Sequence, residues 1–183
     1  LLGDRPVSVE VTSNDHAEML QQARRFVTWA PNIVVKIPVI NEEGTPSLDV
    51  VKTLSSEGIK VNCTAILSYG QVVMACKAGA YFASVFAGRV ADEGHDAPKL
   101  IRSVVEFVER WKYPTRVLVG SIRQPIDIQQ AVEAGAHIIT VPPDVLAKFT
   151  DHKYSRETVR VFNADARKAL ARMGELVTSR AKG

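Results

Sequence analysis

Short runs rich in Val and Ile alternate with longer segments of helical period along the whole chain. Apolar β-branched runs of about four to eight residues are typical of buried strands, and apolar residues spaced by about 3.6 positions are typical of helices that cover one face. Gly58, Gly79 and Gly135 each follow a predicted helix, where a left-handed C-cap favours glycine. We expect strands at 7–11, 33–38, 60–64, 81–86, 116–121 and 137–141, and helices at 17–29, 47–57, 70–78, 98–111, 126–134, 144–149 and 155–178.

Strands that alternate with helices predict an α/β fold with a parallel sheet, here the (β/α)8 TIM barrel with the first two βα units missing from this chain. Such a barrel has eight strands and typically about 250 residues, whereas this chain has 183 residues. Asp4, Arg5 and Pro6 lead directly into the first predicted strand, with no helix before it. We therefore expect residues 1–183 to form a single barrel domain of about six of the eight units plus a carboxyl-terminal helix.

Composition and charge narrow the class of protein. Hydrophobic residues make up 46% of the chain and charged residues 23%, which is ordinary for a soluble globular protein. The formal net charge of +3, from 23 basic and 20 acidic residues, is too balanced to favour binding to nucleic acid. No apolar run approaches the roughly 18 residues of a membrane span, so we expect no association with a membrane.

Cysteine and histidine usage predicts a reducing compartment and no metal centre. Cys63 and Cys76 lie in apolar contexts, which favours buried free thiols in the cytoplasm over a disulfide. The histidines are scattered singly without the spacing of metal ligands, and we expect them to be structural or solvated. They are His16, His95, His137 and His152.

Lys36 lies in the middle of an apolar β-branched run, the segment Asn-Ile-Val-Val-Lys-Ile-Pro-Val at 32–39. Burying an ammonium without a partner costs several kcal/mol, so a buried lysine tends to lose its proton. A neutral lysine is a nucleophile suited to Schiff-base chemistry on a carbonyl substrate. The alternative is a lysine at a strand end that reaches solvent or pairs with a carboxylate, and Lys36 alone leaves both interpretations open.

Polar residues share one face and one end of several predicted strands. Side chains alternate between the two faces of a strand, so residues with the parity of Lys36 point into the barrel. Each of them singly is explained as well by a turn, a backbone hydrogen bond or a surface charge. Together they lie at the carboxyl ends of their strands, where barrel enzymes carry catalytic groups, and they predict a site for a multiply hydroxylated substrate. These residues are Ser8, Glu10, Lys36, Asn62, Thr64, Ser84 and Ser121, with Phe86 on the face of Ser84.

Two arginines directly follow predicted strands. Arg89 comes after the fourth strand and Arg123 after the fifth. Guanidinium groups match phosphate oxygens with two hydrogen bonds, and barrel enzymes often hold phosphate in their late βα loops. With Ser121 as a further donor, the two arginines predict a substrate that carries phosphate.

Short segments of the chain resemble, in order, the motifs of the transaldolase family, particularly its short members. The resemblance covers nearly the whole chain. It implies a (β/α)8 barrel that forms a Schiff base with a ketose phosphate and moves a dihydroxyacetone unit to an aldose phosphate. This is a reaction of the pentose phosphate pathway and needs no cofactor. The segments are VSVEV at 7–11, VVKIP at 34–38, NCT at 62–64, AGA at 78–80, FAGR at 86–89, GSIR at 120–123 and TVP at 140–142.

The resemblance also implies roles for single residues. Lys36 falls on the Schiff-base lysine, and Glu10 and Thr64 fall on residues that position the water of imine formation and hydrolysis. The family's first-strand aspartate, a general acid/base, and its Thr-Asn-Pro motif have no counterpart in this chain, so we expect the chain as given to be incomplete as an enzyme. Asn62 and Ser84 fall on contacts to the sugar hydroxyls, and Arg89, Ser121 and Arg123 fall on the phosphate site.

Two alternatives stay open. A related aldolase cleaves fructose 6-phosphate to free dihydroxyacetone and carries glutamine and tyrosine where this chain has Glu10 and Phe86, which favours transaldolase. The other alternative is a non-catalytic relative that binds a sugar phosphate. In either case we expect sugar phosphates as partners and a homo-oligomer formed through the carboxyl-terminal helix, where Val159, Phe162, Ala166, Ala169 and Met173 fall on one face.

Overall fold

The computed structural model describes residues 3–180, with side chains through residue 174, as two compact units. The first unit ends at Pro142 and the second begins at Pro143. A six-stranded sheet forms the first unit, and each strand lies beside the next one in the sequence. The strands are β1 (Val7–Glu10), β2 (Ile33–Pro38), β3 (Val61–Ile66), β4 (Phe82–Phe86), β5 (Arg116–Gly120) and β6 (Ile138–Ile139).

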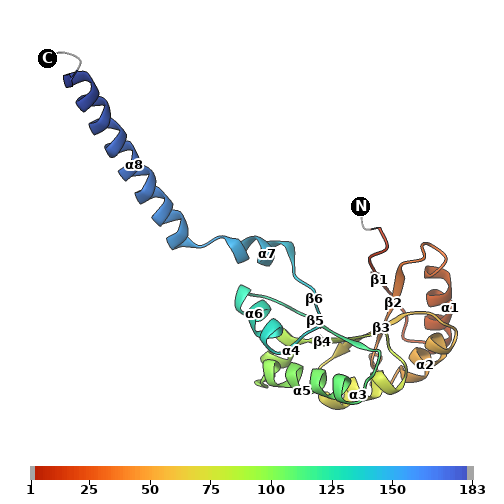
Figure 1. Cartoon of the computed structure of the whole chain (residues 1–183). Coiled ribbons are helices and arrows are strands. Elements are labelled where there is room, and N and C mark those ends of the chain that lie inside the picture. The colour runs from red at the N-terminus through yellow and green to blue at the C-terminus, as the bar shows by residue number, and fades with distance from the viewer. Residues whose placement is uncertain (1–2, 181–183) are drawn as a thin grey trace. The chain divides into compact units, whose positions relative to one another are not determined.

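All neighbouring strand pairs are parallel, and helices connect them. Figure 1 shows a curved sheet whose outer side is covered by helices of the first unit. This arrangement confirms the α/β class and is that of six of the eight units of a (β/α)8 barrel. The prediction that residues 1–183 form one domain stays a prediction. The helices are α1 (His16–Phe26), α2 (Leu48–Ser56), α3 (Tyr69–Lys77), α4 (Ala87–Asp92), α5 (Ala97–Arg110), α6 (Pro125–Glu133), α7 (Pro143–Thr150) and α8 (Lys153–Arg180).

The glycines predicted to end helices do so. Gly58, Gly79 and Gly135 have φ angles of 78°, 87° and 86°, in the left-handed region that favours glycine. After each glycine, the next backbone N–H donates to a carbonyl five residues earlier, as Ile59 does to Leu54. This bond satisfies one of the last carbonyls of the helix and turns the chain into the next strand.

The alternation of side chains along the strands places the core under the helices. Val35 and Ile37 of β2 are fully buried, whereas Ser8 and Glu10 of β1 are exposed. The predicted inward face is therefore the face that no helix of the first unit covers, and it is open to solvent at β1. Burial of apolar residues on the other face is the main stabilising contribution.

Both cysteines are buried free thiols, as predicted. Burial raises the pKa of the Cys63 thiol to about 12 and also raises the pKa of Cys76. Both thiols are therefore protonated and unreactive near neutral pH.

Several elements differ from the prediction. The strand predicted at 137–141 is only Ile138–Ile139, and the helix predicted at 17–29 ends at Phe26. α4 directly follows β4, where the sequence predicted a loop, because six residues are too short to show a helical period. β3 continues to Ile66 instead of ending at residue 64. Its pairing with β4 shifts between Cys63 and Ile66, where Ala65 has a φ of 58°. Such an irregularity changes the direction of the neighbouring side chains, and here it lies next to Thr64.

The second unit consists of α7 and α8. Within this unit the predicted apolar face of α8 is exposed, with 65% of Phe162 and 57% of Met173 accessible. The observed helix begins two residues before the predicted one. Among the described residues, no helix is both long enough and apolar enough to cross a membrane.

Candidate functional site

The register of the first three strands brings a carboxylate, an amine and an amide into one row. Glu10 of β1 pairs with Lys36 of β2, and Lys36 pairs with Asn62 of β3. Because directly paired residues in neighbouring strands point to the same face, the three side chains lie side by side. Glu10 ends β1 and Lys36 lies two residues before the end of β2, as predicted, whereas Asn62 is the second residue of β3 and lies near its amino end.

The Lys36 ammonium has a carboxylate partner. Its Nζ donates a hydrogen bond of 3.0 Å to Oε2 of Glu10. The Lys36 side chain is 25% exposed and that of Glu10 is 54% exposed. Of the two interpretations of Lys36, the pairing with a carboxylate is therefore present in the structure, and the ammonium is not isolated in the core. The same contact gives the amine an acceptor for its proton at hydrogen-bonding distance.

A chain of hydrogen bonds joins residues of β1, β3 and β4. The Ser84 hydroxyl donates to Oδ1 of Asn62 at 2.6 Å, and Nδ2 of Asn62 donates to Oγ of Ser8 at 3.1 Å. Asn62 and Ser84 are each only 2% exposed. Both neighbours are hydroxyls, which can donate as well as accept, so the chain satisfies both ends of the Asn62 amide.

The hydroxyl of Thr64 is buried and has no hydrogen-bond partner among the described residues. Thr64 is only 1% exposed. A buried hydroxyl without a partner is uncommon because its desolvation is not compensated. Thr64 therefore offers an unused donor and acceptor on the strand that carries Asn62.

Ser121 and Arg123 pack against Gly88 in α4. A Cβ atom at Gly88 would lie 2.4 Å from the Ser121 carbonyl oxygen, 2.8 Å from its Oγ and 2.9 Å from Nε of Arg123. Only glycine allows this close approach of the turn after β5 to α4. Ser121 itself has a φ of 60°, which is a sparsely populated conformation for a residue with a side chain.

The two predicted phosphate arginines lie on different elements. Arg89 is exposed on α4, and Arg123 follows β5. Both terminal nitrogens of Arg123 donate to the carboxylate of Asp92, at 2.5 Å each. The hydrogen bond from Arg123 holds the pKa of Asp92 below its ordinary value, with weaker contributions from the charges of Arg123 and Arg89.

The predicted residues therefore form two groups. One group lies on β1 to β4 and contains two separate sets of hydrogen bonds, Lys36 with Glu10 and Ser84 with Asn62 and Ser8, together with Thr64. The other lies around Gly88, at the ends of β4 and β5. Phe86 lies between them in the sequence of β4, and its ring is 3.7 Å from the position of a Cβ at Gly120. No hydrogen bond between the two groups is present among the described residues.

Sequence reasoning missed two participants. Ser8 was placed on the inward face but was given no role, although it accepts from Asn62. Asp92 was not noticed at all. Its signal in the sequence is the spacing of three residues after Arg89, which puts both on one face once 87–92 is recognised as helical.

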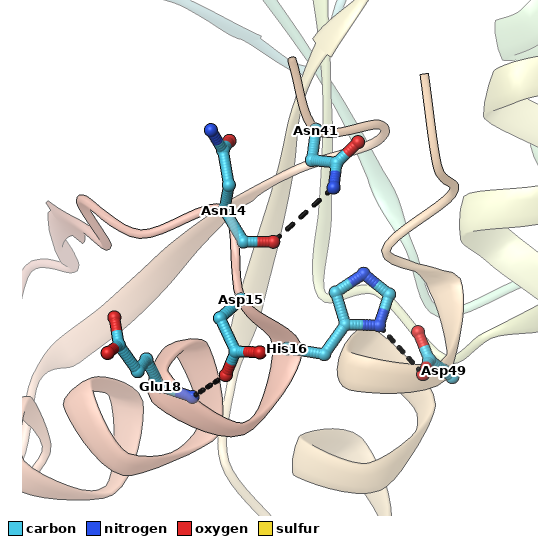
Figure 2. Close-up of polar contacts among 6 residues, drawn as sticks. All are labelled: Asn14, Asp15, His16, Glu18, Asn41 and Asp49. Atoms are coloured by element: carbon cyan, nitrogen blue, oxygen red, sulfur yellow. Dashed lines mark hydrogen bonds and ion pairs between the residues drawn. The ribbon is translucent and has the colours of Figure 1, made fainter. Parts of the chain in front are cut away.

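Polar contacts also join the two loops that follow Glu10 and Lys36. Figure 2 shows Nδ2 of Asn41 donating to the carbonyl oxygen of Asn14 at 3.3 Å, and Nδ1 of His16 paired with Oδ2 of Asp49 at 3.0 Å. These contacts tie the loop after β1 to the segment after β2. His16 thus has a structural partner, and the part of the chain that the structure describes contains no cluster of potential metal ligands.

The fold and the site define a protein of the barrel type, with a paired amine and carboxylate at the carboxyl ends of parallel strands. Residues 1–180 match the Transaldolase/Fructose-6-phosphate aldolase family. A probable transaldolase of Dehalococcoides mccartyi is 41% identical over 165 residues, which are 90% of this chain and 74% of that protein. A probable transaldolase of Herpetosiphon aurantiacus is 41% identical over 160 residues, or 87% of this chain and 71% of that protein. The chain belongs to the transaldolase/fructose-6-phosphate aldolase family.

Solved structures show the same fold at low identity. A mandelate oxidase variant matches with a TM-score of 0.56 and 21% identity, over 76% of this chain and 48% of that one. A 4-hydroxy-2-oxoglutarate aldolase matches with a TM-score of 0.51 and 18% identity, over 76% of this chain and 60% of that one. The chain thus spans less than two thirds of either structure, and these similarities concern the fold alone.

Proposed function

We propose that this protein acts as a transaldolase. It transfers a dihydroxyacetone unit from fructose 6-phosphate or sedoheptulose 7-phosphate to erythrose 4-phosphate or glyceraldehyde 3-phosphate, as in the pentose phosphate pathway. The observation that carries the proposal is the Lys36 amine, held 3.0 Å from Glu10 at the carboxyl ends of the strands in a member of this family. An amine of this kind and a ketose carbonyl are sufficient for Schiff-base chemistry without a cofactor.

Lys36 is the nucleophile in imine formation, and Glu10 is the proton acceptor. Attack on the C2 carbonyl requires a neutral amine, and Glu10 is placed to take the proton that Lys36 must lose. A bond forms between Nζ and C2, and the carbonyl oxygen leaves as water after it has been protonated. Thr64 matches the family residue that positions this water, and the same water returns when the imine is hydrolysed.

The remaining polar residues hold the sugar and its phosphate. Asn62, which is hydrogen-bonded to Ser84, presents groups that match sugar hydroxyls. Arg89, Ser121 and Arg123 supply cationic and hydroxyl donors for the phosphate at the ends of β4 and β5. The phosphate then anchors the end of the substrate remote from C2, which orients the carbonyl toward the amine.

Phe86 and Glu10 favour transfer over release of free dihydroxyacetone. A phenyl ring has no proton to give to the enamine that remains on Lys36 after cleavage, whereas a tyrosine hydroxyl has one. The enamine therefore stays bound to Lys36 until it reacts with a second aldehyde. The alternative within the family is fructose-6-phosphate aldolase activity, in which the enamine is protonated and released.

One assay separates these activities. Incubation of the intact parent protein with fructose 6-phosphate and erythrose 4-phosphate should give sedoheptulose 7-phosphate and glyceraldehyde 3-phosphate in equal amounts, and Lys36→Met should give neither. Release of free dihydroxyacetone at the same rate without erythrose 4-phosphate would instead identify an aldolase. Binding of fructose 6-phosphate without any product would identify a non-catalytic relative.

We further propose that the protein forms homo-oligomers through α8 and works in the cytoplasm. The exposed apolar side chains of α8, among them Val159, Phe162 and Met173, support self-association. The buried free thiols Cys63 and Cys76 support a reducing compartment.

A further inference from the structure

Asp92, the last residue of α4, binds the end of the Arg123 side chain. Its Oδ1 accepts from Nη1 of Arg123 and its Oδ2 accepts from Nη2, at 2.5 Å each. Arg89, one turn earlier on the same helix, acts on the Asp92 carboxylate through its charge. The carboxylate therefore interacts with both arginines of the proposed phosphate site.

The two hydrogen bonds determine which edge of the guanidinium is left for a ligand. A guanidinium carries five N–H donors in a rigid fork, with one two-donor edge between the terminal nitrogens and another that includes Nε. Asp92 occupies the terminal edge. Nε lies on the other side of the group, against Gly88, and the Oγ of Ser121 borders the same glycine. The Nε edge, which makes no hydrogen bond among the described residues, and the Ser121 hydroxyl therefore both border Gly88.

We propose that Asp92 is a positioning residue, which holds the terminal nitrogens of Arg123 so that the Nε edge and the Ser121 hydroxyl together receive the substrate phosphate. This inference rests on the proposed function, in which Arg123 binds phosphate. Asp92 itself does not touch the substrate. It acts by removing rotamer freedom from a long side chain, which would otherwise have to be ordered when the phosphate binds.

The opposite role for Asp92 would be competition, in which its carboxylate occupies the place of the phosphate and must be displaced. The two roles predict opposite signs for the same substitution. Asp92→Asn keeps the shape of the side chain and one acceptor oxygen but removes the charge. If Asp92 positions Arg123, Asp92→Asn weakens phosphate binding, and if Asp92 competes, it strengthens binding.

The expected effect is small because the pair is exposed. The Arg123 and Asp92 side chains are 49% and 48% accessible, and exposed ion pairs have modest coupling. We expect Asp92→Asn to raise the Kd for a phosphorylated ligand roughly 2- to 5-fold. Glu93→Gln is a matched control, since it removes the same charge from the adjacent exposed residue.

Calorimetric titration in the Lys36→Met background tests this inference, because that variant forms no imine and reports binding alone. The ligands are fructose 6-phosphate and inorganic phosphate, and each variant is first shown to keep the melting temperature of its parent. Asp92→Asn should raise the Kd of both ligands by a similar factor, and Glu93→Gln should change neither Kd. Asp92→Glu should bind both ligands more tightly than Asp92→Asn but less tightly than the parent. In the Arg123→Ala background, Asp92→Asn should cause no further loss.

Three results would overturn the inference. They are tighter ligand binding by Asp92→Asn, an equal loss of affinity in Glu93→Gln, and an undiminished loss of affinity when Asp92→Asn is made in the Arg123→Ala background. If the expected pattern holds for inorganic phosphate while fructose 6-phosphate gives no imine with the protein that retains Lys36, the positioning role stands and the proposed function fails. If transfer activity is present but the pattern is absent, the function stands and the positioning role fails.

Discussion

Replacing Ser84 by alanine tests whether the buried hydrogen-bond chain holds the site in shape. Ser84 and Asn62 are each 2% exposed, and their hydrogen bond of 2.6 Å is buried. The substitution leaves the Asn62 carbonyl oxygen desolvated and without this donor. Such a loss costs about 1–3 kcal/mol of unfolding free energy, whereas the volume removed is a single oxygen. We therefore expect Ser84→Ala to destabilise the first unit by about 2 kcal/mol.

The matched control is Ser8→Ala, at the other end of the same chain. Ser8 is exposed, so water can replace its hydroxyl as the acceptor for Asn62, and we expect a loss below about 1 kcal/mol. Urea unfolding followed by tryptophan fluorescence measures the loss of unfolding free energy in the two variants. The two tryptophans, Trp29 and Trp111, lie in the first unit. Equal losses for the two variants, or no loss for Ser84→Ala, would refute the reasoning.

Further predictions concern the phosphate site, a buried thiol and α8. Arg123→Ala should lower kcat/KM for phosphorylated substrates roughly 10- to 150-fold and leave unphosphorylated sugars nearly unchanged, and an equal loss for both would indicate a structural role. Burial raises the pKa of Cys63 to about 12 from 9.0, so the folded state retains a proton that the unfolded chain loses. The contribution of Cys63 to the free energy of unfolding is complete below pH 9 and falls by at most about 1.4 kcal/mol per pH unit above it. Urea unfolding at several pH values should therefore show that the free energy of unfolding falls less steeply with pH in Cys63→Val than in the unchanged protein. Phe162→Asp combined with Met173→Asp should shift the protein to smaller species in light scattering, and an unchanged mass would exclude α8 as the interface.

The alternation of apolar runs was sufficient to predict the fold of the first unit. Short β-branched runs such as the one around Lys36 have a length and composition that favour strands, and the predicted and observed bounds of β2 agree. Strand parity then placed Glu10, Lys36 and Asn62 on one face, and the observed register pairs them directly. These inferences succeed because they depend on local geometry, which a sequence records.

Contacts between distant segments were not predictable in the same way. The partner of Arg123 lies 31 positions earlier, on a helix of six residues that has too few turns to show a period. Glu10, the carboxylate that pairs with Lys36, was predicted to lie on the same face of the sheet. Only the structure shows that the two groups are in contact. The hydrogen bonds of the Asn62 amide likewise involve Ser84 and Ser8, which lie 22 and 54 positions away.

The most direct test of the central claim is reductive trapping at Lys36. The protein is incubated with fructose 6-phosphate and borohydride, digested, and the modified peptide is located by mass spectrometry. If Lys36 forms the imine, a stable adduct appears on the peptide that contains this residue and is absent in Lys36→Met. A Lys60→Met variant, which removes a lysine at the opposite end of the strands, should be labelled as fully as the unchanged protein. Labelling of another lysine, or labelling that persists in Lys36→Met, would contradict the assignment.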